Sequence, residues 1–357
     1  MGLYAILMLS RGSAMQKTIF VVDDNDTNLS TAEAAVEEQC QVMTLPSAAA
    51  MFELLEEITP DLILLDIEMP EMDGLEALQL LKASELHAGI PVIFLTSVSD
   101  AAVEVRGFEM GVVDFITKPF SGPVLRHRIK THLSIDEMIR ERTAQLEQLQ
   151  NGLVYILADI VESRDKATGG HIERTSEYVR ILIREMLARG VYADEIRAMN
   201  LETFASSARL HDVGKIAIPD TVLNRLGSLS LEEFEMVKTH TVEGARIIDK
   251  VIARTGDLAF LRNAKLFASC HHERWDGSGY PHGLKGMEIP LQGRILAIAD
   301  LYDALLSDRP YHKAFEEEEV VGIIMNNAGK MFDPLIVEVF LAIKEQFAEA
   351  RRGLTLH

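Results

Sequence analysis

The sequence predicts a multidomain protein in three parts: a doubly wound α/β unit on a five-stranded parallel sheet, a long coiled-coil-like linker helix, and an all-α domain. Short apolar runs alternate with helical stretches from Lys17 to about Leu133, and no alternating strand pattern follows Asn151. Between these regions, apolar residues recur at spacings of three and four, which is typical of a helical seam. At 357 residues, the chain is long enough for two domains with ordinary cores.

The composition excludes some classes of function. Hydrophobic residues make up 48% of the chain and charged residues 25%, which is typical of a globular protein rather than a disordered one. The formal net charge of −20 argues against binding of a nucleic-acid polymer, which needs a basic face. Because Cys40 and Cys270 are the only cysteines, we expect no disulfide framework and a cytoplasmic location.

The first 16 residues are expected to be a disordered leader, with the real start of the protein near Met15. The apolar run Leu3–Leu9 in this leader is too short to span a bilayer and has no basic stretch before it. No other segment approaches transmembrane length, so we expect no membrane span.

Five apolar runs predict the strands of the first domain. Continuous runs of this length, separated by helices, are typical of parallel strands that helices cover on both faces. The runs are Ile19–Asp23, Gln41–Leu45, Asp61–Asp66, Pro91–Thr96 and Val113–Thr117. Sheets of this kind bind ligands at the carboxyl ends of their strands, where a strand-end Asp alone is usually a turn or cap residue. Here a whole set lies at those ends: Asp23, Asp24, Asp66, Thr96 and Lys118.

On these residues, the segment 17–133 resembles a two-component receiver domain. The resemblance implies that Asp66 accepts a phosphoryl group from a sensor histidine kinase, and that Asp23 and Asp24 hold Mg²⁺. The chemistry agrees, because an acyl phosphate on a carboxylate needs a divalent ion and a cation such as Lys118 to offset its charge.

The resemblance also implies a switch. The hydroxyl of Thr96 would follow the phosphoryl group, and an aromatic side chain would turn inward. Phe115 stands at the position of that aromatic residue, which is often Tyr in the family. Because Phe has no hydroxyl that could form a hydrogen bond at the surface, we expect the switch to work by packing alone.

A heptad seam predicts the linker helix over residues 134–163. Its positions are alternately four and three residues apart, and one of them is polar. They are Ile135, Ile139, Arg142, Leu146, Leu149, Leu153, Ile156 and Ile160. One interpretation is an amphipathic helix that packs on its own domain, and the other is a parallel coiled coil between two protomers. The position of the seam between two domains favours the homodimer.

Six residues of metal-binding types stand out in the C-terminal half of the sequence. They are His211, Asp212, His240, His271, His272 and Asp300. A lone histidine on a helix is usually a core or surface residue, but imidazoles and carboxylates that recur along a helical segment favour a metal centre assembled from several helices. With this number of ligands, one carboxylate could bridge two ions, which indicates hydrolysis of a phosphate ester.

The region from Leu153 to Phe347 resembles the HD-GYP family of the HD phosphohydrolase superfamily. The motifs that carry the resemblance are His211-Asp212 with Lys215, His271-His272-Glu273, the loop from Asp276 to Pro281, and Asp300 with Asp303-Ala304-Leu305. The resemblance implies an all-helical domain that hydrolyses cyclic di-GMP to pGpG and sometimes to GMP. We place this domain at residues 164–357, with a first helix that could begin near residue 151.

Carried over onto this sequence, the family's metal ligands form two groups that share one carboxylate. The first group is His171, His211, Asp212 and Asp300, and the second is His240, His271 and His272 with Asp212 as the bridge. The catalytic residues would be His211, Asp212 and Lys215, and the substrate's phosphates would be bound by Lys215, Arg309 and Lys313. Such mixed imidazole and carboxylate ligands suit Fe, Mn, Co, Ni or Zn.

The sequence departs from the family pattern at two positions. Some members hold a third ion with a Glu one helical turn before the first ligand histidine, and because this chain has Ala167 there, we expect two ions. His312 stands where Lys or Arg is frequent, which leaves Lys313 as the neighbouring cation. The loop Gly279-Tyr280-Pro281 is expected to be structural or to face partners, with Tyr280 displayed, and diguanylate cyclase (GGDEF) proteins are candidate partners.

The leading interpretation is a response regulator whose output is cyclic di-GMP phosphodiesterase activity under the control of Asp66. One alternative is a signalling scaffold that recruits partner proteins and hydrolyses little, although the complete set of ligands argues against it. The other alternative is an enzyme that prefers pGpG or another cyclic dinucleotide, because these motifs assign no purine-recognition residues.

Overall fold

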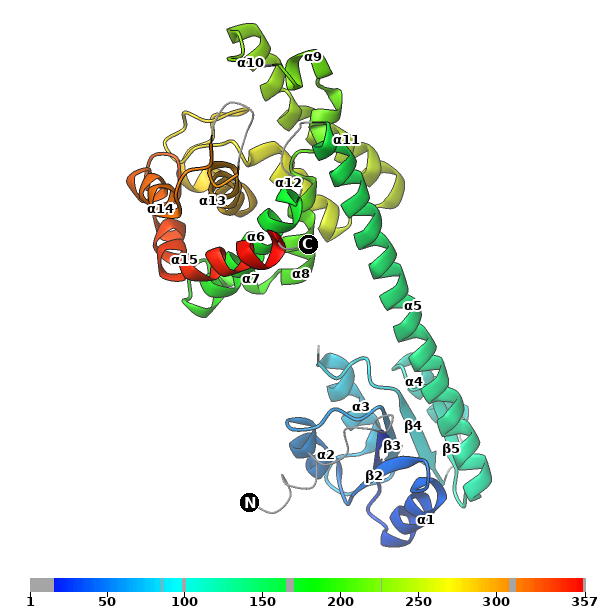
Figure 1. Ribbon diagram of the computed structural model, residues 1–357. Coiled ribbons are helices and arrows are strands. Elements are labelled where there is room, and N and C mark those ends of the chain that lie inside the picture. The colour runs from blue at the N-terminus through cyan, green and yellow to red at the C-terminus, as the bar shows by residue number, and fades with distance from the viewer. Residues whose placement is uncertain are drawn as a thin grey trace. The chain divides into compact units, whose positions relative to one another are not determined.

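The computed structural model describes every residue except 1–15, 85, 98–100, 165–169, 226, 308–312 and 356–357. Almost all of the predicted leader therefore lies outside the described residues, as do Ala167, Arg309 and His312. The chain divides into two compact units, with the division between Leu146 and Glu147. Figure 1 shows an α/β unit followed by a helical unit, as the sequence predicts.

The first unit contains a five-stranded parallel sheet in the order β2-β1-β3-β4-β5. The strands are β1 (Lys17–Val22), β2 (Cys40–Leu45), β3 (Leu62–Asp66), β4 (Val92–Thr96) and β5 (Asp114–Thr117). Every residue of β3 and β4 is buried, which explains why their sequences are continuous apolar runs rather than alternating ones. The predicted fold class is confirmed.

Helices cover both faces of this sheet. They are α1 (Asp26–Val36), α2 (Ala48–Leu55), α3 (Gly74–Ala83), α4 (Ala101–Glu109) and the start of α5 (Gly122–Ser163). Alternate residues of β1 belong to different cores: Phe20 packs with residues of α2 and α3, whereas Ile19 packs with residues of α1 and α5. Asp73 caps α3 by accepting a hydrogen bond from the backbone N–H of Glu76, which fixes the turn that follows β3.

The linker is the second part of one continuous helix, α5, which is 42 residues long. The boundary that we placed at residue 134 has no break in secondary structure, because the last helix of the first unit simply continues. Pro123 is tolerated because it lies in the first turn, where its missing N–H has no intrahelical partner. The two units are therefore joined without a loop.

The apolar seam of α5 is exposed in the single chain. Its seven apolar positions, Ile135, Ile139, Leu146, Leu149, Leu153, Ile156 and Ile160, expose between 45% and 66% of their surface. A different side of the same helix is buried in the second unit, through Val154, Ala158 and Val161. Packing of α5 on its own domain thus uses other residues and leaves the seam without a partner in the described part of the chain.

The second unit is helical. Its α-helices are α6 (His171–Ala188), α7 (Ala193–Arg197), α8 (Leu201–Ser207), α9 (Asp220–Leu223), α10 (Leu231–Lys238), α11 (His240–Thr255), α12 (Ala259–Cys270), α13 (Leu291–Leu305), α14 (Glu317–Asn326) and α15 (Pro334–Thr355). Short 3-10 helices are η1 (Ala208–Leu210), η2 (Val213–Ala217) and η3 (Gly286–Glu288). Among the described residues of this unit, the only β pairing is an isolated bridge between Ala328 and Phe332.

An aromatic core holds α6, α13 and α15 together. Tyr178 of α6 stacks on Phe347 of α15 with ring centroids 4.6 Å apart. Tyr302 of α13 meets both rings edge-on, at 5.3 and 5.2 Å. All three side chains are fully buried. This core fixes the two helices that carry His171 and Asp300 relative to each other.

None of the helices in the described segments is both long enough and apolar enough to cross a membrane.

Candidate metal centre and phosphoacceptor site

Most of the metal-type residues of the second unit lie at helix ends that meet in its interior, whereas Asp300 lies within α13 (Leu291–Leu305). His171 begins α6, and His240 begins α11. His211 and Asp212 occupy the junction between η1 and η2, and His271 follows the last residue of α12. Helix ends bring the backbone polar groups and the side chains to one place, so a polar cluster forms without interrupting the apolar core around it.

A glycine contact brings Asp212 to His240. A Cβ atom on Gly214 would lie only 1.9 Å from the carbonyl oxygen of His240 and 2.5 Å from the backbone nitrogen of Gly244. No side chain fits there, so η2 can rest on the first turn of α11 only because residue 214 is a glycine. The spacing His211-Asp212-Val213-Gly214 thus carries both two candidate ligands and the contact that positions them.

Three buried imidazoles are oriented by their own helices. The Nδ1–H of His211 donates to the carbonyl oxygen of Ala208 at 2.9 Å, that of His240 to Val237 at 2.6 Å, and that of His271 to Phe267 at 2.9 Å. Because a carbonyl oxygen only accepts, each Nδ1 carries a proton, and whenever the ring is neutral its Nε2 keeps the lone pair. This is the tautomer in which Nε2 binds a metal ion.

His171 is oriented by Asp303, a residue that the sequence analysis used only as part of a motif. The Nδ1–H of His171 donates to a carboxylate oxygen of Asp303 at 2.8 Å, which leaves Nε2 facing the centre, 3.4 Å from Asp300. Asp303 is fully buried and also accepts from Arg174 at 2.6 and 2.9 Å and from Arg351 at 3.1 Å. Its position three residues after Asp300 places both carboxylates on one face of α13. This spacing is the feature of the sequence that could have identified Asp303 as part of the site.

The ligand-type atoms form two groups with Asp212 between them. In one group, atoms of His171, His211 and Asp212 lie within 4.8 Å of one another, and in the other those of His240, His271 and His272 do. Oδ2 of Asp212 lies 3.4 Å from Nε2 of His211, whereas Oδ1 lies 3.4 Å from Nε2 of His240. One carboxylate thus presents one oxygen to each group.

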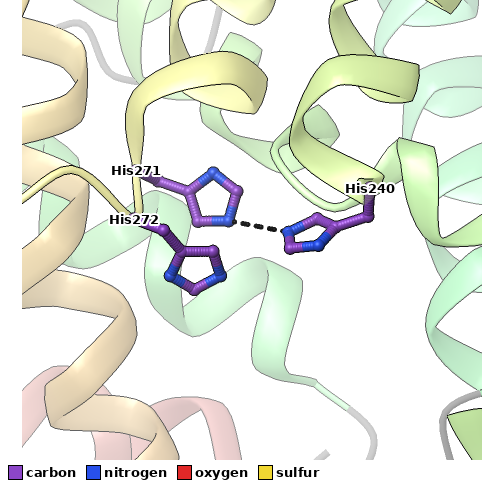
Figure 2. Close-up of side chains that lie close together, drawn as sticks. All are labelled: His240, His271 and His272. Carbon is purple, nitrogen blue, oxygen red and sulfur yellow. Dashed lines mark hydrogen bonds between the residues drawn. The ribbon is translucent and has the colours of Figure 1, made fainter. Parts of the chain in front are cut away.

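The three-histidine group has a geometry that suits a cation. Figure 2 shows His240, His271 and His272 turned toward one another, with Nε2 of His240 and Nε2 of His271 3.3 Å apart. Both Nδ1 atoms already donate to carbonyl oxygens, so in the neutral rings two lone pairs face each other. Nitrogens that share one ion at about 2.1 Å are roughly 3.0–3.4 Å apart at octahedral to tetrahedral angles. The spacing therefore fits a shared metal ion better than a hydrogen bond.

Unpartnered buried atoms also fit a metal. Within the described residues, Nε2 of His211 and Oδ1 of Asp212 are buried and make no hydrogen bond. Burial lowers the pKa of His240, and it lowers the pKa of His271 to about 3. Burial and the neighbouring histidines also hold the pKa of His272 well below its usual range. These three rings are neutral at pH 7, as ligands must be.

The group around His211 and Asp212 contains both positive and negative side chains. Although burial opposes it, the carboxylates of Asp212 and Asp300 raise the pKa of His211 to about 9. Burial likewise opposes ionisation of Asp212, but Lys215 and His211 hold its pKa well below the usual range. Nζ of Lys215 lies 2.8 Å from Oδ2 of Asp212. Protonated His211 and Lys215 supply the positive charge beside Asp212. A divalent ion bound to Asp212 would supply positive charge at the same place.

Glu162, near the end of α5, is a further carboxylate that sequence reasoning does not single out. Its Oε1 is buried and makes no hydrogen bond with any described residue. Burial raises the pKa of Glu162, while the nearby His171 and His211 lower it. A third negative side chain thus lies in the field of the first group. Its sequence context is that of an ordinary helix residue, so nothing in the pattern marks it.

The loop after His272 does not display Tyr280, which corrects our expectation. The Tyr280 ring is half-buried and packs against His272, with centroids 4.8 Å apart and the ring planes tilted by 35°. A Cβ on Gly279 would lie 2.3 Å from the backbone nitrogen of Arg274, so the loop closes tightly there. Glu273 holds the loop by accepting from the backbone N–H groups of His282 and Leu284 at 2.8 and 3.0 Å. Pro281 ends the motif at a cis peptide bond.

The phosphate-contact residues are only partly described. Arg309 lies outside the described residues, and Lys313 is exposed. Lys215 is therefore the one predicted substrate contact that the described part of the structure places beside the cluster.

The first unit brings its predicted site residues together at the carboxyl end of the sheet. Ligand atoms of Asp23, Asp24 and Asp66 lie within 4.8 Å of one another. Nζ of Lys118 lies 2.6 Å from Asp23 and 2.7 Å from Asp66. Burial raises the pKa of Asp66, and the bond to Lys118 opposes that shift. Three carboxylates with one lysine form a site that could hold Mg²⁺.

The switch residues lie beside this site. Thr96 ends β4 and is buried. Phe115 is buried as well, and its ring packs against Phe94 at 5.5 Å and Phe108 at 5.0 Å. A Cβ on Gly107 would lie 2.6 Å from the tip of the Phe115 ring, so this glycine makes room for the inward position.

An α/β unit with this acidic site, followed by a helical unit with a histidine-rich cluster, defines a receiver joined to an effector. The response regulator receiver domain matches residues 19–130, and the HD domain matches residues 155–336. The chain belongs to the HD domain family, with a receiver domain in front of the HD domain. Both resemblances inferred from the motifs are thereby confirmed.

Two of the similar proteins match this chain over most of their own length, and a third matches over a shorter stretch. A protein of Vibrio cholerae serotype O1 named "Probable cyclic di-GMP phosphodiesterase" is 36% identical over 96% of this chain and 81% of its own length. The "Cyclic di-GMP phosphodiesterase response regulator RpfG" of Xanthomonas campestris pv. campestris is 37% identical over 81% of this chain and 77% of its own length. The "3'3'-cGAMP-specific phosphodiesterase 2" of Vibrio cholerae serotype O1 is 36% identical over 58% of this chain and 38% of its own length.

Replacement of Gly214 by alanine should separate η2 from α11. The added Cβ has no space, so we expect a loss of roughly 1–3 kcal/mol or more in the free energy of unfolding, together with loss of metal from the three-histidine group. Thermal unfolding and elemental analysis of the purified variant measure both.

The matched control is Gly322→Ala in α14, where no heavy atom lies within 4 Å of the new Cβ. Its stability should stay the same or rise by up to about 1 kcal/mol. An unchanged melting temperature and full metal content in Gly214→Ala would refute the close approach.

Proposed function

We propose that the protein is a response regulator that hydrolyses cyclic di-GMP to pGpG with two divalent metal ions in its HD domain. The observation that carries this proposal is the position of Asp212, which offers one oxygen to each of two histidine groups. The names of two relatives that match most of this chain support cyclic di-GMP as the substrate. A phosphate diester is the substrate class that a two-ion site serves best.

The proposed ligands divide as the sequence predicts. His171, His211, Asp212 and Asp300 would hold one ion, and His240, His271 and His272 the other, with Asp212 shared. When bound, two such ions supply Lewis acidity to the phosphodiester and a nucleophile at neutral pH. Imidazole and carboxylate ligands suit Fe, Mn, Co, Ni or Zn. Which of these metals is bound therefore depends on its availability in the cell.

The chain's own residues supply the rest of the chemistry. Asp212 is ionised, and Lys215 is 2.8 Å from it, so the Lys215 ammonium would offset the negative charge that builds up on the oxygens of a phosphate bound at Asp212. The backbone acceptors of His211, His240 and His271 hold the rings in place, which removes the cost of ordering them during the reaction. Lys313 and Arg309 remain proposed phosphate contacts.

A different cyclic dinucleotide is the second candidate substrate. The relative from Vibrio cholerae that is named for 3'3'-cGAMP is 36% identical over 209 residues, a stretch as long as the second unit. Further hydrolysis of pGpG is the other open possibility. The scaffold alternative is not favoured, because relatives that match most of this chain are named as cyclic di-GMP phosphodiesterases.

The deciding experiment compares hydrolysis of cyclic di-GMP, 3'3'-cGAMP and pGpG by protein loaded with Mn²⁺ or Fe²⁺ without oxygen. We expect cyclic di-GMP to be the preferred substrate. In the double variant His211→Ala/Asp212→Ala, turnover should fall by about 10³ or more, because the shared carboxylate is lost.

The control is Asp257→Ala, which removes an exposed carboxylate paired with Arg262 and should leave turnover unchanged. Metal content is measured in every sample. Two bound ions without turnover of any of the three substrates would contradict the proposal and favour the scaffold.

We also propose that Asp66 is phosphorylated by a sensor histidine kinase and that Mg²⁺ binds beside it. Asp66 is almost fully buried, within reach of Lys118 and next to Asp23. Phosphorylation would break the bond between Asp66 and Lys118 and draw Thr96 toward the new oxygens. A ligand or modification shifts an equilibrium only if it favours one state, so the altered bonds at Asp66 must differ between states of α5.

Asp66→Asn tests this coupling. Acetyl phosphate with Mg²⁺ should change the rate of dinucleotide hydrolysis in the wild type, and the variant should not respond, because it has no carboxylate that can accept the phosphoryl group. Phosphorylation is followed on a phosphate-affinity gel beside the rate assay. Equal rates of hydrolysis in the variant and in phosphorylated wild type would show that phosphorylation of the receiver does not control the enzyme.

We propose that α5 joins two copies of the chain in a parallel coiled coil. The seam is apolar over 26 residues and exposed in the single chain, which is costly unless a second helix covers it. A second copy matches the seam by symmetry. Diguanylate cyclase proteins remain proposed partners of the helical unit.

Leu146→Glu together with Leu149→Glu should weaken the dimer. Two like charges at facing positions of a seam are repelled and desolvated, so the dissociation constant should rise by about tenfold or more. Sedimentation velocity across a concentration series measures it. Gln148→Glu with Gln150→Glu adds the same charge beside the seam and should leave the dimer intact; a monomeric wild type would refute the coiled coil.

A further inference from the structure

Helix α10 carries an aromatic side chain that the core does not use. None of its residues, 231–238, is buried, although the structure describes all of them. A complete capping box of Ser230 and Glu233 stabilises the helix locally, so it forms without a buried face. Phe234 exposes 45% of its surface. An exposed aromatic ring on such a helix contributes little to stability and is available to a ligand.

Phe234 lies at the edge of the metal centre. Its ring meets the ring of Tyr280 edge-on, with centroids 6.4 Å apart. Tyr280 in turn packs in a tilted arrangement against His272, one of the three histidines drawn in Figure 2. The order His272, Tyr280, Phe234 is therefore a row of rings that leads outward from the proposed second ion. A ligand with its phosphate at the histidines would extend along this row.

A lysine lies over the same two rings. Nζ of Lys238 is 5.5 Å from the ring centroid of Phe234 and 5.6 Å from that of Tyr280. The ammonium is held by Glu235 at 2.6 Å, and Lys238 follows Phe234 by one helical turn. Aromatic faces together with a positioned cation are the features that bind a nucleobase, because every base has a π-face and guanine offers acceptors at O6 and N7 to a lysine.

We propose that Phe234, Lys238 and Tyr280 form the base-binding side of the substrate site and take a guanine base of the dinucleotide. This inference rests on the proposed function, since it assigns the purine contact for the same site. Phe234 would stack on the base, and Lys238 would donate to its acceptor edge. The sequence motifs assign no purine recognition, and α10 lies outside them, between His211-Asp212 and His240.

The test compares two phosphodiesters that differ in the base. Cyclic di-GMP carries guanines, and methyl p-nitrophenyl phosphate carries no purine. The ratio of kcat/KM for the first over that for the second should fall by about fivefold or more in Phe234→Ala, since stacking on an aromatic side chain contributes roughly 5- to 150-fold per base. The loss should appear in KM rather than in kcat. Lys238→Ala should lower the same ratio, and Phe234→Trp should restore it.

The control is Leu231→Ala on the same helix, which removes a side chain that is 86% exposed and should leave the ratio unchanged. Titration calorimetry of GMP onto the metal-loaded protein gives a readout without turnover, and its affinity should fall in Phe234→Ala. Metal content and circular dichroism accompany each variant.

The outcomes separate the two proposals. If the wild type cleaves the simple ester but no dinucleotide, the proposed function is contradicted. The affinity for GMP in wild type and in Phe234→Ala then still tests whether the base site exists. Wild type that cleaves both, with an unchanged ratio and unchanged GMP affinity in Phe234→Ala and Lys238→Ala, overturns the base site alone. An equal loss on both substrates also overturns it, because it would show a general defect of the metal centre.

Discussion

The second unit depends on one constraint: imidazole nitrogens have to face one carboxylate in the interior with their lone pairs free. The fixed hydrogen bonds of Nδ1 in His211, His240 and His271 meet that constraint. Burying unpartnered polar atoms such as Nε2 of His211 is unfavourable without a cation. A protein that builds such a cluster gains folding free energy when the metal binds, because the ligands then lose their mutual repulsion. The proposed metal ions would therefore stabilise the fold.

Asp303, which orients His171, must also have its buried charge balanced by neighbouring groups. A buried carboxylate is costly unless it is paired, and Asp303 has Arg174, Arg351 and the ring of His171 as partners. The pKa of Asp303, despite its burial, is lowered to about 2 by His171 and Arg174. Asp303 therefore stays ionised and keeps His171 in one orientation. Since Arg351 comes from α15, the last helix of the unit contributes to the position of a ligand on α6.

The sequence predicted what local pattern determines and missed what long-range packing determines. Apolar runs identified the strands because helices bury both faces of the sheet, and motif residues identified both acidic and histidine-rich clusters. The close approach at Gly214 depends on where α11 lies, which no spacing within the motif records. The packing of Tyr280 against His272 likewise depends on a loop that Glu273 folds back. Glu162 has no sequence signal, because only the approach of His171 and His211 makes its position special.

Helix α5 limits how the receiver can influence the metal centre. Its start packs in the core of the first unit through Leu125 and Ile129, and its end packs in the second through Val154 and Ala158. The same small core at the end of α5 contains Ile172, the neighbour of His171. A rotation or a change of partner along the exposed seam therefore cannot occur without repacking side chains next to a proposed ligand, because close-packed cores do not deform smoothly.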